Sequence, residues 1–219
     1  MADRVMTAAA VATDVAAVSN DVARALVSAG RRMDLRGWVP ATSGNLSARI
    51  GPDLMAITRS GVHKGFLAEL DIIAVDFDGR PVDPAMRSSA ETLLHCQIYR
   101  LWPSVGAVLH GHSIAATALT LALPRARTIQ FQGYEIVKAW NGAGTHDADV
   151  PLPVIDNDQD MQRLAGRIAP MLEAGQAPIG YVLRGHGVYV WGPDVISTLN
   201  RMEALEFLLA AEIERRKLL

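Results

Sequence analysis

Three residues in the middle of the chain, His110, Gly111 and His112, have the types and the spacing of a metal-binding pair. They follow an apolar run, residues 105–109, whose length and composition predict a short buried strand. Side chains alternate faces along a strand, so residues two apart point the same way. We therefore expect the two imidazoles to converge on one point at the end of this strand.

His186 is the best third ligand among the six histidines, because it lies between Gly185 and Gly187 in a predicted turn. Three imidazoles with one open coordination position are the pattern of a catalytic zinc site. The single cysteine, Cys96, argues against a thiolate site, since a zinc-ribbon site needs several cysteines. The alternative is that these histidines only bond to the backbone at strand ends, and the spacing favours a metal over that alternative.

Small polar residues next to glycine, or at a predicted helix start, offer hydroxyl and backbone N–H donors that suit an anion. Lys64 adds a nearby positive charge. Taken singly, each segment is a common turn or helix cap. Beside a metal site, together they indicate a small phosphorylated substrate. The segments are Thr42-Ser43-Gly44-Asn45, Ser60-Gly61 and Ser88-Ser89.

The composition indicates a globular chain without a nucleic-acid or membrane partner. Of 219 residues 50% are hydrophobic, which is enough for one substantial core, and we expect a single domain over residues 1–219. The net charge of −2 and the lack of a basic run argue against nucleic acid. No apolar stretch approaches the roughly 20 residues that span a bilayer. The lone cysteine and the absence of a signal-peptide pattern fit a cytoplasmic protein.

The elements that must position these residues alternate between strands and helices, with several hairpin signals. This pattern predicts a mixed, largely antiparallel sheet with helices on its faces. We expect a helical region over residues 8–35 with a break at Gly30, and a helix over 89–101 capped by Ser89. Residues 150–155 contain prolines, which predicts an edge strand. Residues 194–218 are predicted to form the last helix.

The order of five motifs resembles the class II aldolase/adducin family over nearly the whole chain. That family contains sugar-phosphate aldolases and epimerases, a dehydratase branch and non-enzymatic adducin-like members. Further segments, at residues 89–95, 133–139, 156–160 and 184–192, resemble the dehydratase branch most. The five motifs are Thr42-Ser43-Gly44-Asn45-Leu46-Ser47, Ser60-Gly61, Ser89-Ala90-Glu91, His110-Gly111-His112-Ser113 and Arg184-Gly185-His186-Gly187.

The resemblance implies a three-layer α/β/α sandwich, a homotetramer and one Zn²⁺ per subunit. It implies that zinc is held by His110, His112 and His186, and that Glu135 is the acid/base of a dehydration. It also implies that the substrate phosphate binds to Gly44, Asn45, Ser60, Gly61 and Ser89.

Two alternatives stay open at the level of residue types. Aldolases of the family have a catalytic glutamate where Glu91 stands, so C–C cleavage or epimerisation is the second hypothesis. Glu135 and Lys138 also fit a solvated amphipathic segment, because glutamate is usually exposed.

A third hypothesis, adducin-like assembly without catalysis, conflicts with the retained histidines. His95 follows Glu91 by four residues, and residue types do not decide whether it contacts the site or only its own helix.

Overall fold

The computed structural model describes residues 18–140 and 144–219. Within these residues, eight strands form one sheet in the order β3-β2-β1-β4-β8-β7-β6-β5. Neighbouring strands are antiparallel except for β6 and β7, which are parallel. The strands are β1 (Asn45–Arg49), β2 (Leu54–Thr58), β3 (Ile72–Asp76), β4 (Ala107–Gly111), β5 (Thr128–Phe131), β6 (Val150–Ile155), β7 (Tyr181–Leu183) and β8 (Gly187–Gly192).

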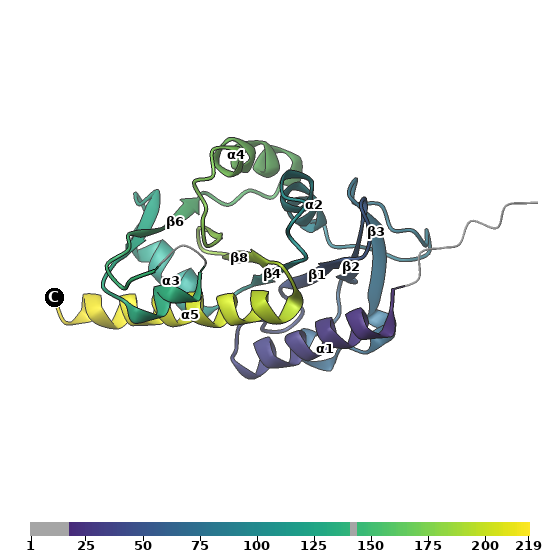
Figure 1. Ribbon diagram of the computed structural model, residues 1–219, viewed down its shortest axis with the longest axis horizontal. Helices are drawn as coiled ribbons and strands as arrows, with labels where there is room; N and C mark the ends of the chain where they lie inside the picture. The colour runs from purple at the N-terminus through teal and green to yellow at the C-terminus, as the bar shows by residue number, and fades with distance from the viewer. Residues whose placement is uncertain (1–17, 141–143) are drawn as a thin grey trace, which may run out of the picture.

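Helices cover both faces of the sheet, which produces three layers (Figure 1). The layer below the sheet in Figure 1 contains α1 (Asn20–Leu35), α3 (Ile114–Ala122) and α5 (Val195–Lys217). The layer above contains α2 (Thr92–Leu101) and α4 (Met161–Glu173), which pack against each other. Short 3₁₀ turns are η1 (Lys64–Phe66), η2 (Glu69–Asp71) and η3 (Glu135–Ala139). The expected α/β/α sandwich with a largely antiparallel sheet is confirmed.

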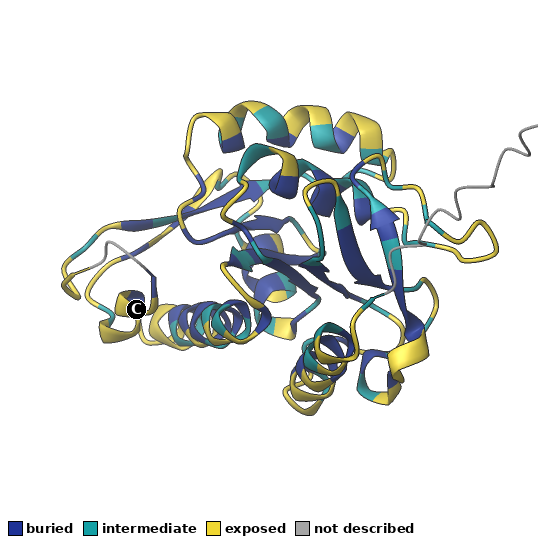
Figure 2. Cartoon of the chain, turned by 45° about the vertical axis from the view of Figure 1, so that its right-hand side comes forward, coloured by how far each residue is buried: buried dark blue, intermediate teal, exposed yellow. Residues whose placement is uncertain are grey.

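The central strands are buried on both faces, as the dark core of Figure 2 shows. In β4, Ala107 and Leu109 pack into the core shared with α1 and α5, whereas Val108 packs into the core under α2 and α4. This double burial explains why the run before His110 is continuously apolar rather than alternating. By the same alternation His110 faces the α2 side, where its ring stacks on Tyr189 with centroids 4.0 Å apart.

Two expectations about helices were wrong in detail. α1 continues through Gly30 without a break, and the glycine is required because a Cβ there would lie 2.6 Å from the Lys64 carbonyl oxygen. Residues 8–17 of the predicted helical region lie outside the described residues. α2 begins at Thr92 with Glu91, not Ser89, at the N-cap position.

β6 is not an edge strand, because it pairs with β5 on one side and with β7 on the other. The Val154 amide donates to the Arg127 carbonyl on the β5 side. The nitrogens of Pro151 and Pro153 therefore point to the opposite side, where β7 pairs only with Val154 and Ile155. The prolines thus interrupt no ladder hydrogen bond. In the described part of the chain, no helix is long and apolar enough to cross a membrane.

Candidate active site

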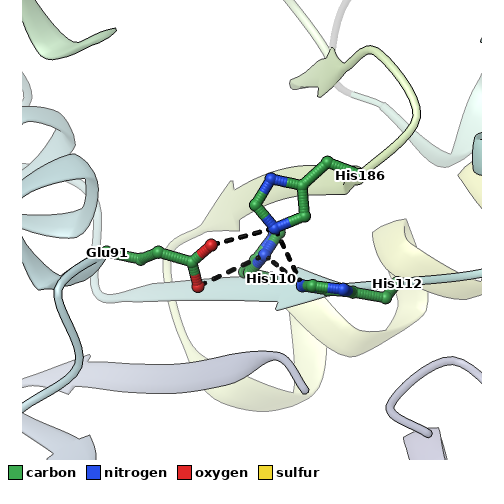
Figure 3. A group of neighbouring side chains, drawn as sticks. All are labelled: Glu91, His110, His112 and His186. Atoms are coloured by element: carbon green, nitrogen blue, oxygen red, sulfur yellow. Dashed lines mark hydrogen bonds and ion pairs between the residues drawn. The ribbon is translucent and has the colours of Figure 1, made fainter. Parts of the chain in front are cut away.

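The structure brings the three predicted histidines together and adds a carboxylate (Figure 3). One ligand atom from each of Glu91, His110, His112 and His186 lies within 4.8 Å of the others. The Nε2 atoms of His110 and His112 are 2.8 Å apart, and those of His112 and His186 are 3.1 Å apart. Glu91 Oε1 lies 2.9 Å from His186 Nε2. We call these four residues the histidine–glutamate cluster.

Glycines allow the segments that carry the histidines to lie against each other. His110 is in β4, and His112 follows directly after its end, where its amide donates to the Trp38 carbonyl at 2.6 Å. A Cβ at Gly111 would lie 3.0 Å from that same carbonyl oxygen. A Cβ at Gly187 would collide with the Gly111 carbonyl oxygen. These contacts give a physical reason for glycine between the two histidines and after His186.

The histidine–glutamate cluster presents the donor set of a cation site. The Nδ1 atom of His110 lies 2.9 Å from the Val188 carbonyl oxygen, and that of His186 lies 3.2 Å from Asn157 Oδ1. Both acceptors select the tautomer with a proton on Nδ1, which leaves the Nε2 lone pairs directed into the cluster. Converging imidazole lone pairs beside a carboxylate suit Zn²⁺, and they also suit other first-row divalent metals.

The electrostatics of the cluster favour a neutral His112 and a charged Glu91 carboxylate. Burial, together with repulsion from the neighbouring His110 and His186, lowers the pKa of His112 to about 3. Burial would by itself raise the pKa of Glu91, but hydrogen bonds with His110 and His186 outweigh it and hold that pKa well below its usual range. A neutral imidazole and a charged carboxylate are the forms that bind a metal.

His95 contacts the cluster indirectly, which answers the question that residue types left open. It is fully buried, with Nδ1 2.7 Å from Ser47 Oγ and Nε2 in contact with Asn45 Oδ1. The Asn45 amide in turn donates to Glu91 Oε2 at 2.7 Å. This chain of contacts holds the Glu91 carboxylate toward the histidines. The spacing of Glu91 and His95 was the sequence signal for it, but the link through β1 depends on the fold.

The five residues of the predicted phosphate site line one small cavity of about 210 Å³ beside the cluster. Lys64, Glu91 and His112 also line this cavity. Gly44 has a left-handed backbone, with φ of 73°, and a Cβ there would lie 2.7 Å from the His110 carbonyl oxygen. The five residues are Gly44, Asn45, Ser60, Gly61 and Ser89.

The donors of this cavity suit an anion. Lys64 is only 2% exposed, and its Nζ donates to the carbonyl oxygens of Thr42 and Val62 at 2.8 and 2.7 Å. An ammonium group carries three protons, so one N–H is left for a ligand. The buried Ser43 hydroxyl has no hydrogen-bond partner among the described residues. Burial lowers the pKa of Lys64 to about 8, a cost that a bound anion would offset.

Glu135 is not part of either the cluster or the cavity. It lies on η3, its side chain is 73% exposed, and its Oε1 accepts a hydrogen bond from Lys138 Nζ at 2.6 Å. The neighbouring Tyr134 hydroxyl donates to Glu212 on α5 at 2.9 Å, which holds this segment against that helix. Its predicted catalytic role stays a prediction, because within one chain Glu135 does not line the cleft around the histidines.

A larger cavity of about 800 Å³ adjoins the small one, and the two share Ser60, Ser89, Glu91 and His112. His186 lines only the larger cavity. Beyond the cluster, the larger cavity extends to the first turns of α3 and α4. Together the two cavities form one cleft with the histidines at its middle.

Comparison with known proteins finds similarity over nearly the whole chain. The family model described as "Class II Aldolase and Adducin N-terminal domain" matches residues 24–213. The chain is 58% identical over 213 residues to the methylthioribulose-1-phosphate dehydratase of Acidiphilium cryptum (strain JF-5), covering 97% of this chain and 100% of that relative. It is 56% identical over 197 residues to the protein of the same name from Granulibacter bethesdensis, covering 88% and 91%.

Solved structures show the same fold at lower identity. The L-fuculose-1-phosphate aldolase from Thermus thermophilus superposes with a TM-score of 0.72 at 23% identity, covering 90% of this chain and 95% of that one. YgbL from Escherichia coli, a putative aldolase/epimerase/decarboxylase, gives a TM-score of 0.73 at 23% identity, covering 87% of each chain.

Proposed function

Because this chain belongs to the class II aldolase and adducin family, we propose that it is a lyase that dehydrates 5-methylthioribulose 1-phosphate. The product would be 2,3-diketo-5-methylthiopentyl 1-phosphate, an intermediate of methionine salvage. One observation carries the site assignment: the histidine–glutamate cluster and an anion-suited cavity share a wall, as a phosphorylated substrate that reacts at a metal requires.

The substrate phosphate binds in the small cavity. Lys64 supplies a positive charge, and Ser43 supplies a hydroxyl that has no other partner within residues 18–140 and 144–219. The left-handed backbone at Gly44 and Gly61 lets the chain approach the phosphate closely. A charge-assisted hydrogen bond contributes about 1.5–3 kcal/mol, so the phosphate would fix the position of the reacting carbons beside the histidines.

His110, His112 and His186 would hold one Zn²⁺ per subunit, which as a Lewis acid would polarise the substrate oxygens and acidify the proton beside the ketone. Asn45 holds Glu91 against this position at 2.7 Å, and Val188 and Asn157 orient two of the imidazoles. These partners leave the protein little rearrangement to make when the substrate binds.

Dehydration breaks the C3–H bond and the C4–O bond, and the proton and hydroxide leave as one water. The remaining enol then becomes the ketone at C3. A carboxylate must accept the C3 proton, and an acid must protonate the leaving hydroxyl. We assign this acid/base to Glu135, acting from a neighbouring subunit of a homotetramer. The Glu135 side chain is 73% exposed and lies outside the cleft of its own subunit. It is therefore accessible to the cleft of a neighbouring subunit.

Glu91 is the observation that favours a second candidate, a zinc-dependent sugar-phosphate aldolase or epimerase. Its carboxylate lies inside the histidine–glutamate cluster, at the position that matches the catalytic glutamate of the family's aldolases. The dehydratase remains the first proposal, because the relatives at 56% and 58% identity carry that name.

Product analysis on one substrate separates the two candidates. We expect the zinc-loaded protein to convert methylthioribulose 1-phosphate to a product that has lost one water, detected by mass spectrometry. A His112→Ala variant, with its metal content measured in parallel, is the control and should lose both zinc and activity. Release of a three-carbon phosphate instead would reject dehydration in favour of aldol cleavage.

We also place the enzyme in the cytoplasm, without a nucleic-acid or membrane partner. The single cysteine, Cys96, cannot form a disulfide within the chain, and this supports a reducing compartment.

A further inference from the structure

The part of the large cavity beyond the histidine–glutamate cluster has an apolar wall, formed by Ile114 on α3 and Met161 on α4. We propose that this wall binds the methylthio end of the substrate and so selects it over a sugar phosphate that carries a hydroxyl there. The inference rests on the proposed function, and it names the specificity-determining residues of the same site.

Ile114 has no role in the protein core. It is 84% exposed, although it follows the buried cap residue Ser113 and lies two positions after His112. Residues three and four positions further on, Thr117 and Ala118, share its helix face and also line the cavity. Both are small, so the face leaves space beside the isoleucine that an apolar group of the ligand can fill.

Met161 approaches the same cavity from the other helical layer. It is the first residue of α4, where Asp160 caps the helix by accepting from the Arg163 amide at 3.0 Å. Methionine has a flexible, polarizable thioether that adapts to irregular apolar groups. The first residues of α3 and α4, helices from different layers of the molecule, thus line one cavity.

The order of groups along the substrate matches the order of surfaces along the cleft. The phosphate is on C1, the reacting carbons are C2 to C4, and the methylthio group is on C5. Lys64 lines only the small cavity, His112 lines both cavities, and Ile114 lines only the large one. A substrate with its phosphate beside Lys64 and its ketone beside the histidines therefore extends its C5 end toward Ile114 and Met161.

The test compares methylthioribulose 1-phosphate with ribulose 1-phosphate, which carries a hydroxyl in place of the methylthio group. A single methylene in an apolar pocket discriminates by roughly 10–200-fold, so contact of the larger methylthio group with this wall supports a preference of at least about tenfold. We expect Ile114→Ser and Met161→Gln each to lower the ratio of kcat/KM values for the two substrates about tenfold, mainly through a higher KM for the methylthio substrate.

Ile196→Ser is the matched control. Ile196 is also an exposed isoleucine in the first turn of a helix, 72% exposed on α5, but it lines neither cavity. Its variant should keep the wild-type ratio, and all three variants should keep their zinc.

The outcomes separate the inference from the proposed function. If the wild-type protein releases no water from methylthioribulose 1-phosphate, the proposed function fails and this inference fails with it. If the wild type is active but both cavity variants keep its substrate ratio, the apolar wall does not select the methylthio group and the inference alone is overturned. The same conclusion follows if Ile196→Ser changes the ratio as much as Ile114→Ser does.

Discussion

Glu91 illustrates how much a single side chain in this protein depends on groups outside the cluster. Its carboxylate is held by Asn45, and Asn45 is in contact with the buried His95. Among the histidines, His110 is oriented by a β8 carbonyl and His186 by Asn157. Loss of such outer partners commonly weakens metal binding roughly 10- to 100-fold, so we expect these partners to contribute measurably to metal affinity.

Lys64 gives the residue-scale prediction. Lys64→Met should raise the KM for the phosphorylated substrate at least tenfold and change kcat less, because it removes a charge from the phosphate cavity. The pKa of Lys64 is lowered to about 8, so the free enzyme loses this charge as the pH rises through 8. We therefore expect kcat/KM of the wild type to fall above pH 8.

The pH profile of Lys64→Met is the check on that assignment, measured from pH 6 to 10 with zinc content followed at each point. The alkaline fall should vanish in the variant, which has no group to deprotonate there. An unchanged KM, or an alkaline fall of the same size in the variant, contradicts a role for Lys64 in phosphate binding.

The sequence was sufficient to predict the three histidines but not their partners. Strand alternation relates His110 to His112, and flanking glycines point to His186. The contact of Glu91 with these histidines depends on the loop before α2 lying over the end of β4, which neither propensity nor spacing encodes. The link from His95 to Glu91 likewise passes through Asn45 on β1, a residue about fifty positions away in the chain.

At the scale of elements, the hairpin of β7 and β8 and the end of β4 form the framework of the site. Gly185, at the turn of the hairpin, has a φ of 65°, and Gly187 starts β8 against the Gly111 carbonyl. The two segments can approach this closely only because Gly187 carries no Cβ at the point of contact. A small change in this framework therefore separates His186 from the other two histidines.

Gly187→Ala is the prediction at this scale. The added methyl group collides with backbone rather than with a flexible side chain, so we expect a loss of unfolding free energy of about 2 kcal/mol and weaker zinc binding. Gly166→Ala, on α4, is the matched control, because a Cβ there meets nothing within 4 Å and should stabilise the helix by about 0.5–1 kcal/mol. Urea unfolding with and without zinc measures both.

If Gly187→Ala and Gly166→Ala have equal stability and equal zinc affinity, the close contact of Gly187 with the Gly111 carbonyl does not determine the position of His186.

The elements themselves could be predicted to different degrees. Apolar runs and hairpin signals indicated the central strands correctly, because those strands are buried on both faces. The break expected at Gly30 was wrong, since that glycine serves a close approach to Lys64 rather than a helix end. The edge position expected for β6 was also wrong, because the direction of its proline nitrogens follows from the register with β5.

At the scale of the whole molecule, the role proposed for Glu135 depends on the proposed tetramer. Within one chain its segment is held against α5 and stands outside the cleft. A closed ring of identical subunits repeats the same contact at each interface, so one exposed residue per subunit can complete one site per subunit.

A mixing experiment addresses this directly. Glu135→Gln should keep its zinc and lose activity by roughly 10²–10⁴-fold, the usual contribution of an acid/base. When it is co-assembled in equal amounts with His112→Ala, half the sites keep their histidines and half of those meet an intact Glu135, so about a quarter of the wild-type activity should return. Size-exclusion chromatography checks that tetramers form.

No recovery in mixed tetramers contradicts a contribution from the neighbouring subunit. Wild-type activity of Glu135→Gln alone would remove this residue from the mechanism and leave Glu91 as the carboxylate.

β4 pairs with β8, although the ribosome synthesises β4 well before β8. His110 lies opposite Tyr189, and the turn carrying His186 comes just before β8. Such non-local strand pairs form late, because the entropy cost of closing the long loop between them comes before any stabilising contact is made. A growing polypeptide on the ribosome therefore holds two imidazoles long before the third. The full set of three imidazoles therefore exists only after β4 and β8 have paired.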